Sequence, residues 1–124
     1  MKTVLIADDE EHLRLLISTT VSGLNHRTVE ARDGVEAFDL VQREQPDLMI
    51  IDWMMPGMTG IELLKSLRED PETTAIPVIM ITAKAQMADR YQAVLLGIRG
   101  FLAKPFSPLE LLELVEKVLG EGVQ

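Results

Sequence analysis

The sequence predicts an α/β protein in which a doubly wound parallel sheet carries helices on both faces. Two observations lead to this fold class. Five short apolar segments alternate with longer segments of helical periodicity, and three of the five are nearly continuous apolar runs, as in strands buried on both faces. Because βαβ crossovers are right-handed, this alternation places the strands in parallel and the helices on either side of the sheet.

The expected strands follow one another without an intervening linker. We therefore expect a single domain over residues 1–120, with residues 121–124 as a C-terminal tail or the start of a linker, and Gly120–Gln124 as the only loose segment. The expected strands are Val4–Ala7, Thr28–Ala31, Leu48–Ile51, Val78–Ile81 and Gly100–Ala103.

Three of the expected helices begin with a capping box, in which a small oxygen-bearing side chain is followed three residues later by Glu. Pro108 stands at the first position of the last helix, where a missing N–H costs nothing. Gly23 and Gly97 stand where helices should end, and glycine readily adopts the left-handed conformation used there. The capping boxes are Asp33–Glu36, Thr59–Glu62 and Ser107–Glu110.

Composition and charge exclude several classes of protein. The 124 residues include 12 Lys and Arg against 20 Asp and Glu, a formal net charge of −8 that repels nucleic acid phosphates. The absence of cysteine excludes disulfides, thiol catalysis and thiolate metal sites. The apolar runs are far shorter than the roughly 20 residues of a membrane helix. The first residues run directly into a strand, so we expect a cytoplasmic domain without a signal peptide.

Polar and charged side chains stand at the carboxyl ends of four expected strands. In a doubly wound sheet of five strands these ends can be neighbours, and ligands bind in the crevice outside them. Residues that are far apart in the sequence are therefore expected to meet at one site. They are Asp8, Asp9, Glu10 and Glu11 after the first strand, Asp52 after the third, Thr82 after the fourth and Lys104 after the fifth.

This group of side chains suits phosphoryl chemistry. Carboxylates held close together repel one another and raise each other's pKa. A hard divalent cation removes this conflict, and oxygen ligands with open water positions suit Mg²⁺, with Mn²⁺ as an alternative. A carboxylate beside a metal ion, a hydroxyl and an ammonium group can act as a nucleophile toward phosphorus, and the same groups neutralise the charge that develops on the oxygens.

Each of these residues also has an ordinary structural explanation. Asp9 would be a helix N-cap, Asp52 a turn or cap residue, Thr82 a solvated strand end and Lys104 a loop lysine. A functional site is favoured because four separate strand ends must meet in space. The remaining candidates, His12, His26 and the seven Met residues, have no ligand spacing and are interpreted as structural, solvent-facing or core residues.

Five motifs in order along the chain resemble the receiver domains of bacterial two-component systems, of the chemotaxis-regulator kind. They cover essentially the whole chain, and their combination is specific although each motif alone is weak. The resemblance implies a flavodoxin-like (βα)5 fold with strand order 2-1-3-4-5. The motifs are Val4-Leu5-Ile6-Ala7-Asp8-Asp9-Glu10, Pro46-Asp47-Leu48, Asp52-Trp53-Met54-Met55-Pro56-Gly57-Met58-Thr59-Gly60, Pro77-Val78-Ile79-Met80-Ile81-Thr82-Ala83 and Lys104-Pro105-Phe106.

The resemblance implies a role for the acidic residues and their neighbours. Asp52 would be the phosphoacceptor. Mg²⁺ would be bound by Asp9, Asp52 and the backbone carbonyl of Met54, with Asp8 acting through water. Met54 and Lys84 would flank the phosphoryl group and govern access of the hydrolytic water.

The resemblance also implies which groups respond to phosphorylation. Thr82 would hydrogen-bond the phosphoryl oxygens with help from the Ala83 N–H. Lys104 would bridge to the phosphoryl group, and the peptide bond between Lys104 and Pro105 would be cis. Phe101 matches the aromatic switch position, which rotates inward when Thr82 moves.

By this resemblance the chain is a signalling switch rather than a turnover enzyme. It would take its phosphoryl group from a sensor histidine kinase or a phosphotransfer protein, in a self-catalysed reaction that requires Mg²⁺, and would lose it slowly. Downstream it would act on a protein target or a fused output domain, without direct binding to nucleic acid or membrane.

Two departures from the family pattern concern the region of the fifth strand. Family members often carry an acidic pair just before this strand, where the present chain has Gly97-Ile98-Arg99-Gly100. This difference alters the local charge of the signalling face but not the site itself. Phe101 stands where Tyr is also common, so that no hydroxyl is available there.

The last expected helix has more apolar residues than a core-facing stripe needs. Leu109 and Leu112 fall outside the seam that should face the core. Either they pack under the fourth helix or a loop, or they form part of a partner face, which the resemblance also implies and which would allow a homodimer after phosphorylation. The seam is Leu111, Val115 and Val118, and the fourth helix and fifth strand would add Tyr91, Val94 and Phe101 to the face.

Three other functions are weaker. In phosphatases of the haloacid-dehalogenase family, the first strand ends in the motif Asp-x-Asp-x-Thr or Val. The first strand of this chain ends in Asp8-Asp9-Glu10 instead, and no cap-domain insertion follows. A flavin-binding module needs a loop rich in hydroxyls and glycine for the phosphate, and four acids would repel it. A receiver that works without phosphorylation usually lacks an acid or the lysine, and here the set is intact.

Overall fold

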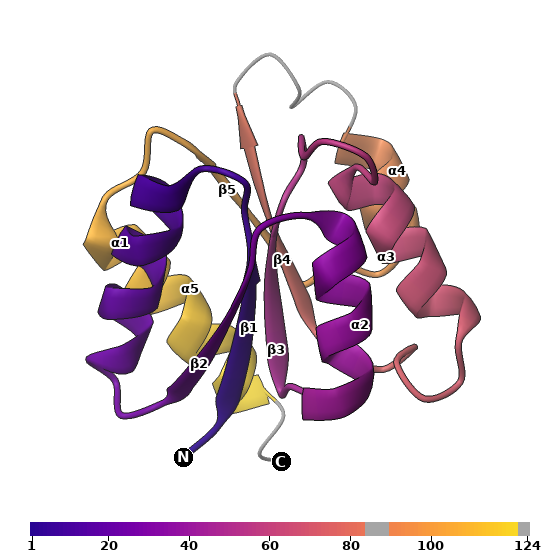
Figure 1. Ribbon diagram of the computed structural model, residues 1–124. Coiled ribbons are helices and arrows are strands. Elements are labelled where there is room, and N and C mark those ends of the chain that lie inside the picture. Colours follow the sequence, from indigo (N-terminus) through magenta and orange to yellow (C-terminus); the bar gives the residue numbers. More distant parts are fainter. Residues whose placement is uncertain (84–89, 122–124) are drawn as a thin grey trace.

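The computed structural model describes residues 1–83 and 90–121. Its five strands form one parallel sheet in the order β2-β1-β3-β4-β5 (Figure 1). Every predicted strand is present and is one or two residues longer than expected, and the predicted order is confirmed. The strands are β1 (Thr3–Ala7), β2 (Arg27–Ala31), β3 (Leu48–Asp52), β4 (Val78–Ala83) and β5 (Gly100–Lys104).

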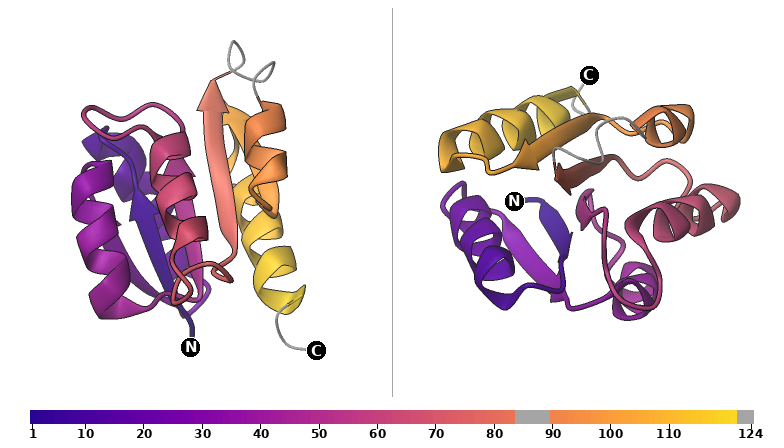
Figure 2. Two further views of the ribbon diagram at one scale, coloured as in Figure 1. Left: turned by 90° about the vertical axis from the view of Figure 1, so that its right-hand side faces the viewer. Right: turned by 90° about the horizontal axis from the view of Figure 1, so that it is seen from above.

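Helices cover both faces of the sheet, as predicted. One face carries α1 (Glu11–Ser22) and α5 (Pro108–Glu121), and the other carries α2 (Gly34–Glu44), α3 (Gly60–Glu69) and α4 (Arg90–Leu95) (Figures 1 and 2). No helix in the described ranges is both long and apolar enough to cross a membrane.

The strands supply both hydrophobic cores because successive side chains point to opposite faces. In β1, Val4 and Ile6 pack with α1 and α5, whereas Leu5 and Ala7 pack with the helices of the other face. The central strands β3 and β4 alternate in the same way. This is why their sequences are continuous apolar runs rather than alternating ones.

The helix starts follow the capping signals in two of three cases. Thr59 and Glu62 form a complete capping box at α3, and Ser107 and Glu110 form one at α5. At α2, Asp33 accepts the Glu36 N–H at 2.8 Å, but the Glu36 carboxylate accepts from the N–H of Arg32 instead of that of Asp33. The third box is therefore only half formed.

Three local predictions need correction. Gly23 ends α1 in the right-handed conformation, with φ −62, whereas Gly97 has the expected positive φ of 74 after α4. The last helix continues through Gly120 to Glu121, so these two residues are helical rather than loose as predicted, and residues 122–124 lie outside the described residues. The methionines are only partly core residues, since Met49, Met55 and Met80 are buried but Met1 and Met54 are exposed.

Candidate functional site

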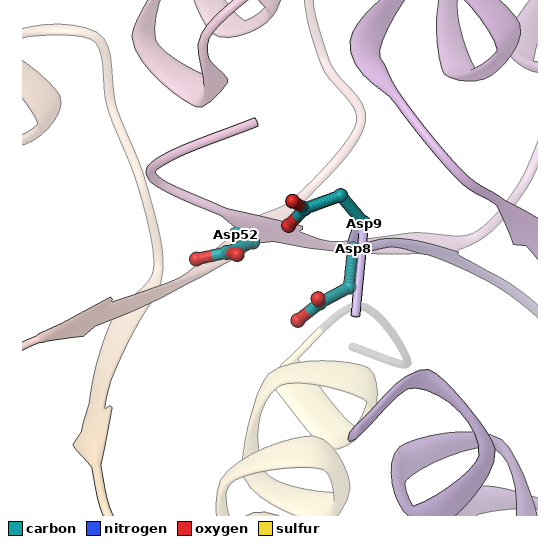
Figure 3. A group of neighbouring side chains, drawn as sticks. All are labelled: Asp8, Asp9 and Asp52. Atoms are coloured by element: carbon teal, nitrogen blue, oxygen red, sulfur yellow. The ribbon is translucent and has the colours of Figure 1, made fainter. Parts of the chain in front are cut away.

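The strand order brings the carboxyl ends of β1, β3, β4 and β5 side by side, as the sequence predicted. One carboxylate oxygen from each of Asp8, Asp9 and Asp52 lies within 4.8 Å of the other two, and Figure 3 shows the three side chains close together. The Lys104 ammonium lies 3.4 Å from Asp52 Oδ2. Residues from three strand ends thus share one site.

Asp52 is the last residue of β3, and its side chain is almost completely buried. Burial raises the pKa of this carboxyl. The Lys104 ammonium and a hydrogen bond from the Met54 N–H act in the opposite direction, and the charge of Asp9 adds to the rise. The carboxyl group is therefore desolvated but has a cation that favours its ionised, nucleophilic form.

Asp8 is fully buried, whereas Asp9 is exposed beside it. Asp8 Oδ1 accepts the Glu10 N–H at 2.8 Å, and Oδ2 has no hydrogen-bond partner within the described residues. Burial, followed by the charges of Asp52 and Asp9, raises the pKa of Asp8 to about 6. A buried carboxylate oxygen left without a partner is costly, so the site is suited to a partner from outside the chain.

The donor set fits Mg²⁺. Hard divalent ions prefer carboxylate oxygens, and Mg²⁺ usually keeps several water molecules and few protein ligands. Asp8 and Asp52 are buried while Asp9 faces solvent, which leaves one open side for water or substrate. The predicted contribution of the Met54 carbonyl stays a prediction, although the Met54 side chain is 54% exposed at the rim.

Thr82 and Lys104 stand where the sequence placed them, Thr82 on β4 beside β3 and Lys104 on β5 one strand further out. Thr82 is fully buried and its hydroxyl donates to the Ala83 carbonyl at 3.1 Å. It pairs with Ala103 across the sheet, one residue before Lys104. The cis peptide bond between Lys104 and Pro105 is confirmed.

Two further residues were predicted to act near the site, and the structure describes only one of them. Phe101 is half-buried and packs against the core on the face of α2, α3 and α4, so its role as a switch stays a prediction. Lys84 lies outside the described residues.

The ordinary explanation of Asp9 as a helix cap is wrong. The N-cap of α1 is Glu10, and it makes no side-chain capping hydrogen bond. The interpretation of the histidines holds, since His12 is exposed and His26 Nδ1 accepts the Lys2 N–H at 3.2 Å.

Sequence reasoning missed Arg14, which fixes the loop that carries the acids. Its Nη1 donates to the Asp8 carbonyl at 2.8 Å, and its Nε donates to Glu30 at 3.1 Å. The Asp8 N–H is held by the Ala31 carbonyl at 3.1 Å. A cation near the start of a helix is unfavourable to the helix dipole, so the position of Arg14 in the first turns of α1 was the one sequence signal that it has another role.

It also missed Gly60, which lets α3 begin directly against Asp52. A Cβ atom at this position would collide with the carbonyl oxygen of Asp52, and the Gly60 N–H donates to the Trp53 carbonyl at 2.8 Å. The position of the Asp52 backbone therefore depends on the absence of a side chain at Gly60, eight residues later in the chain.

Comparisons with known proteins give the same assignment. Residues 4–116 match the family described as response regulator receiver domain. The chain is 38% identical over 118 residues to the phosphate regulon transcriptional regulatory protein PhoB of Pseudomonas aeruginosa, covering 95% of this chain and 52% of PhoB. It is 39% identical over 121 residues to a chemotaxis protein CheY homologue of Campylobacter jejuni subsp. jejuni, covering 96% of this chain and 93% of that protein.

Solved structures show the same fold throughout. The chemotaxis response regulator CheY4 of Vibrio cholerae superposes with a TM-score of 0.89 at 32% identity, covering 95% of this chain and 98% of that one. The Francisella response regulator 1452 receiver domain gives a TM-score of 0.89 at 34% identity, covering 98% and 99%. The chain spans about half the length of PhoB but nearly all of the CheY homologue. By its sequence match, its sheet topology and the acids at its strand ends, this chain belongs to the response regulator receiver domain family of two-component systems.

Proposed function

We propose that Asp52 accepts a phosphoryl group in a Mg²⁺-dependent, self-catalysed reaction, delivered by a histidine kinase or a phosphotransfer protein. Membership of the receiver family makes the chain a phosphorylation-activated signalling switch. One observation carries the choice of residue: Asp52 is the carboxylate that both belongs to the acid cluster and contacts Lys104 at 3.4 Å. Asp8 and Asp9 have no such contact among the described ion pairs.

The chemistry of the step assigns a task to each side chain. An oxygen of the Asp52 carboxylate attacks phosphorus, and the bond between phosphorus and the donor atom breaks as the new P–O bond forms. Bound Mg²⁺ would neutralise charge on the phosphoryl oxygens. The Lys104 ammonium stands beside the same carboxylate and stabilises the growing negative charge, and the leaving group takes a proton from solvent.

The same groups account for the loss of the phosphoryl group. Water attacks phosphorus in the acyl phosphate, and the Asp52 carboxylate is released to its starting state. The chain therefore modifies and restores itself, and it is proposed to be a switch rather than an enzyme that turns over a metabolite. A cytoplasmic location is part of the proposal and is supported by the family membership.

The output is proposed to pass through the face formed by α4, β5 and α5. Thr82 pairs with Ala103, and Met80 pairs with Phe101, so the switch residues Thr82 and Phe101 are diagonal neighbours on β4 and β5, two positions apart in the register. Leu109 is 62% exposed and Tyr91 is 69% exposed on the helices that flank β5. A shift of Thr82 toward the phosphoryl group would change the population of two arrangements of this face. A target protein, an output domain or a second copy would bind one arrangement better than the other.

The assignment is tested by incubation with acetyl phosphate and Mg²⁺, followed by the mass of the intact protein. We expect one added phosphoryl group, which is absent in Asp52→Asn and after chelation of the metal. Asp39→Asn, on the exposed surface of α2, is the matched control and should be modified like the wild type. Modification that persists in Asp52→Asn, or a wild type that is never modified, would contradict the proposal.

A further inference from the structure

A cavity of about 450 Å³ lies at the end of the sheet opposite to the acid cluster. It is bounded by the end of α3, the segment before β4 and the segment between α4 and β5, which are neighbours in Figures 1 and 2. Among the described residues that line it, two are arginines, Arg68 and Arg99, and none carries a carboxylate. In a chain with a net charge of −8, this is a local excess of positive charge.

Arg68 is held rigidly at this cavity by three carbonyl groups. Its Nε donates to Leu96 at 2.7 Å, and its Nη1 donates to Ile76 at 2.9 Å and to Thr74 at 3.0 Å. No carboxylate within the described chain pairs with it, and Nη2 makes none of these bonds. Burial, followed by the charge of Arg99, lowers the pKa of Arg68. The guanidinium thus keeps two oriented N–H donors and an unneutralised charge.

Arg99 brings the second cation to the same place. Its backbone N–H donates to the Val78 carbonyl at 2.9 Å, which fixes it beside the first residue of β4, and its side chain is exposed. Arg99 already makes another interaction, but five N–H groups leave donors for a second acceptor. The charge of Arg99 contributes to the lowered pKa of Arg68, which indicates that the two cations lie close together.

We propose that this cavity binds the phosphate group of a small phosphate monoester. Two guanidinium groups provide the forked donors that match phosphate oxygens. The organic part of the ligand would rest on the apolar lining formed by Ile76, Leu95 and Leu96. The neighbouring cavity shares Arg99 but is also lined by Asp47 and Glu72, whose charges disfavour an anion there.

The test is a titration of the ¹⁵N-labelled protein with phenyl phosphate in EDTA, followed by two-dimensional NMR. Saturable shifts are expected at the amides of Ala75, Gly97 and Arg99, with an affinity that falls as salt is added. Phenol should leave these amides unchanged, and inorganic phosphate should shift the same amides at higher concentration. Shifts confined to the residues around Asp52 and Lys104 would overturn the proposal.

Variants separate the cavity from general charge effects. Arg99→Gln should weaken phenyl phosphate binding about tenfold or more, as the loss of a charge-assisted hydrogen bond predicts. Arg43→Gln removes an exposed arginine of α2 and should bind normally. Arg68→Lys keeps the charge but not the fork, and should also bind more weakly. Unchanged binding in Arg99→Gln would refute the site. Because Asp52→Asn should bind phenyl phosphate like the wild type, this outcome is independent of the proposed phosphorylation.

Discussion

The carboxyl group of Asp8 is fully enclosed, and its pKa is raised from 3.8 to about 6. An acid whose pKa is higher in the folded state stabilises the fold below its unfolded pKa, and this contribution is lost as the pH rises through the folded value. Asp8 therefore weakens the metal-free protein at pH 7. We expect Asp8→Asn to raise the free energy of unfolding at pH 7 by on the order of 2 kcal/mol, and to have little effect near pH 4. Urea unfolding in EDTA at the two pH values measures this difference.

The same protonation should compete with Mg²⁺. Trp53 is buried next to Asp52, so its fluorescence can report the binding of metal. Mg²⁺ affinity should fall as the pH drops below about 6 in the wild type, and the slope should be smaller in Asp8→Asn. Asp9→Ala is expected to give no response. Parallel pH profiles in the wild type and Asp8→Asn would show that Asp8 does not titrate with the site.

Single residues were predictable where their position on a strand was predictable. Asp52, Thr82 and Lys104 each follow an apolar run, so their strand ends and their meeting could be inferred from sequence alone. Arg14 could not be found in this way. The Arg14 guanidinium donates hydrogen bonds both to the Asp8 carbonyl and to Glu30, which lies sixteen residues after Arg14 on the edge strand β2. No local sequence pattern predicts such a link.

At the scale of elements, the junction between β3 and α3 depends on Gly60. We expect Gly60→Ala to lower the free energy of unfolding by about 1–3 kcal/mol, the range for overpacking, because the new Cβ meets the Asp52 backbone rather than a movable side chain. Gly120→Ala is the matched control. It is helical with open space around it, and alanine should stabilise that helix by about 0.5–1 kcal/mol.

The rate of phosphorylation distinguishes a displacement of the Asp52 backbone from a general loss of stability. Gly60→Ala should also slow modification by acetyl phosphate while the protein remains folded, because Asp52 is displaced. Equal modification rates in Gly60→Ala and Gly120→Ala would mean that the contact matters only for stability.

Elements were predicted better than their ends. Strands and helices were recognisable from hydrophobic period, which depends on many residues at once. The end of α1 was not, since a positive φ of 65 falls on Asn25 rather than on Gly23. Among residues other than glycine, Asn is one of those that most often adopt a positive φ, so the presence of Gly23 alone did not locate the end of the helix.

At the scale of the whole molecule, the face of α4, β5 and α5 is the surface on which signalling would be read. Leu111, Val115 and Val118 are buried as predicted, whereas Leu109 is 62% exposed and Leu112 is half-buried. We expect Leu109→Ser/Leu112→Ser to remain folded and to lose the tighter self-association or target binding that beryllofluoride induces in the wild type. Sedimentation with and without the phosphoryl mimic measures this.

The matched control for that surface lies on α1. Leu15→Ser/Leu16→Ser removes two exposed leucines from α1, which covers the same face of the sheet as α5 but lies outside the surface formed by α4, β5 and α5, and it should leave the response to beryllofluoride intact. A response lost in both variants, or absent from the wild type, would argue against the proposed face. Unfolding of the α5 variant would instead assign its leucines to the core.

The strand order also has a consequence for how the chain is made. β1 pairs with both β2 and β3, and β4 and β5 are then added in turn at one edge, so each strand finds its partner already synthesised. Between the completion of β3 and the appearance of β4, however, the edge of β3 is open, and all of its side chains are destined for burial. At about 5–20 residues per second this interval lasts a few seconds. During translation, that exposed apolar edge is where a nascent chain would most need a chaperone.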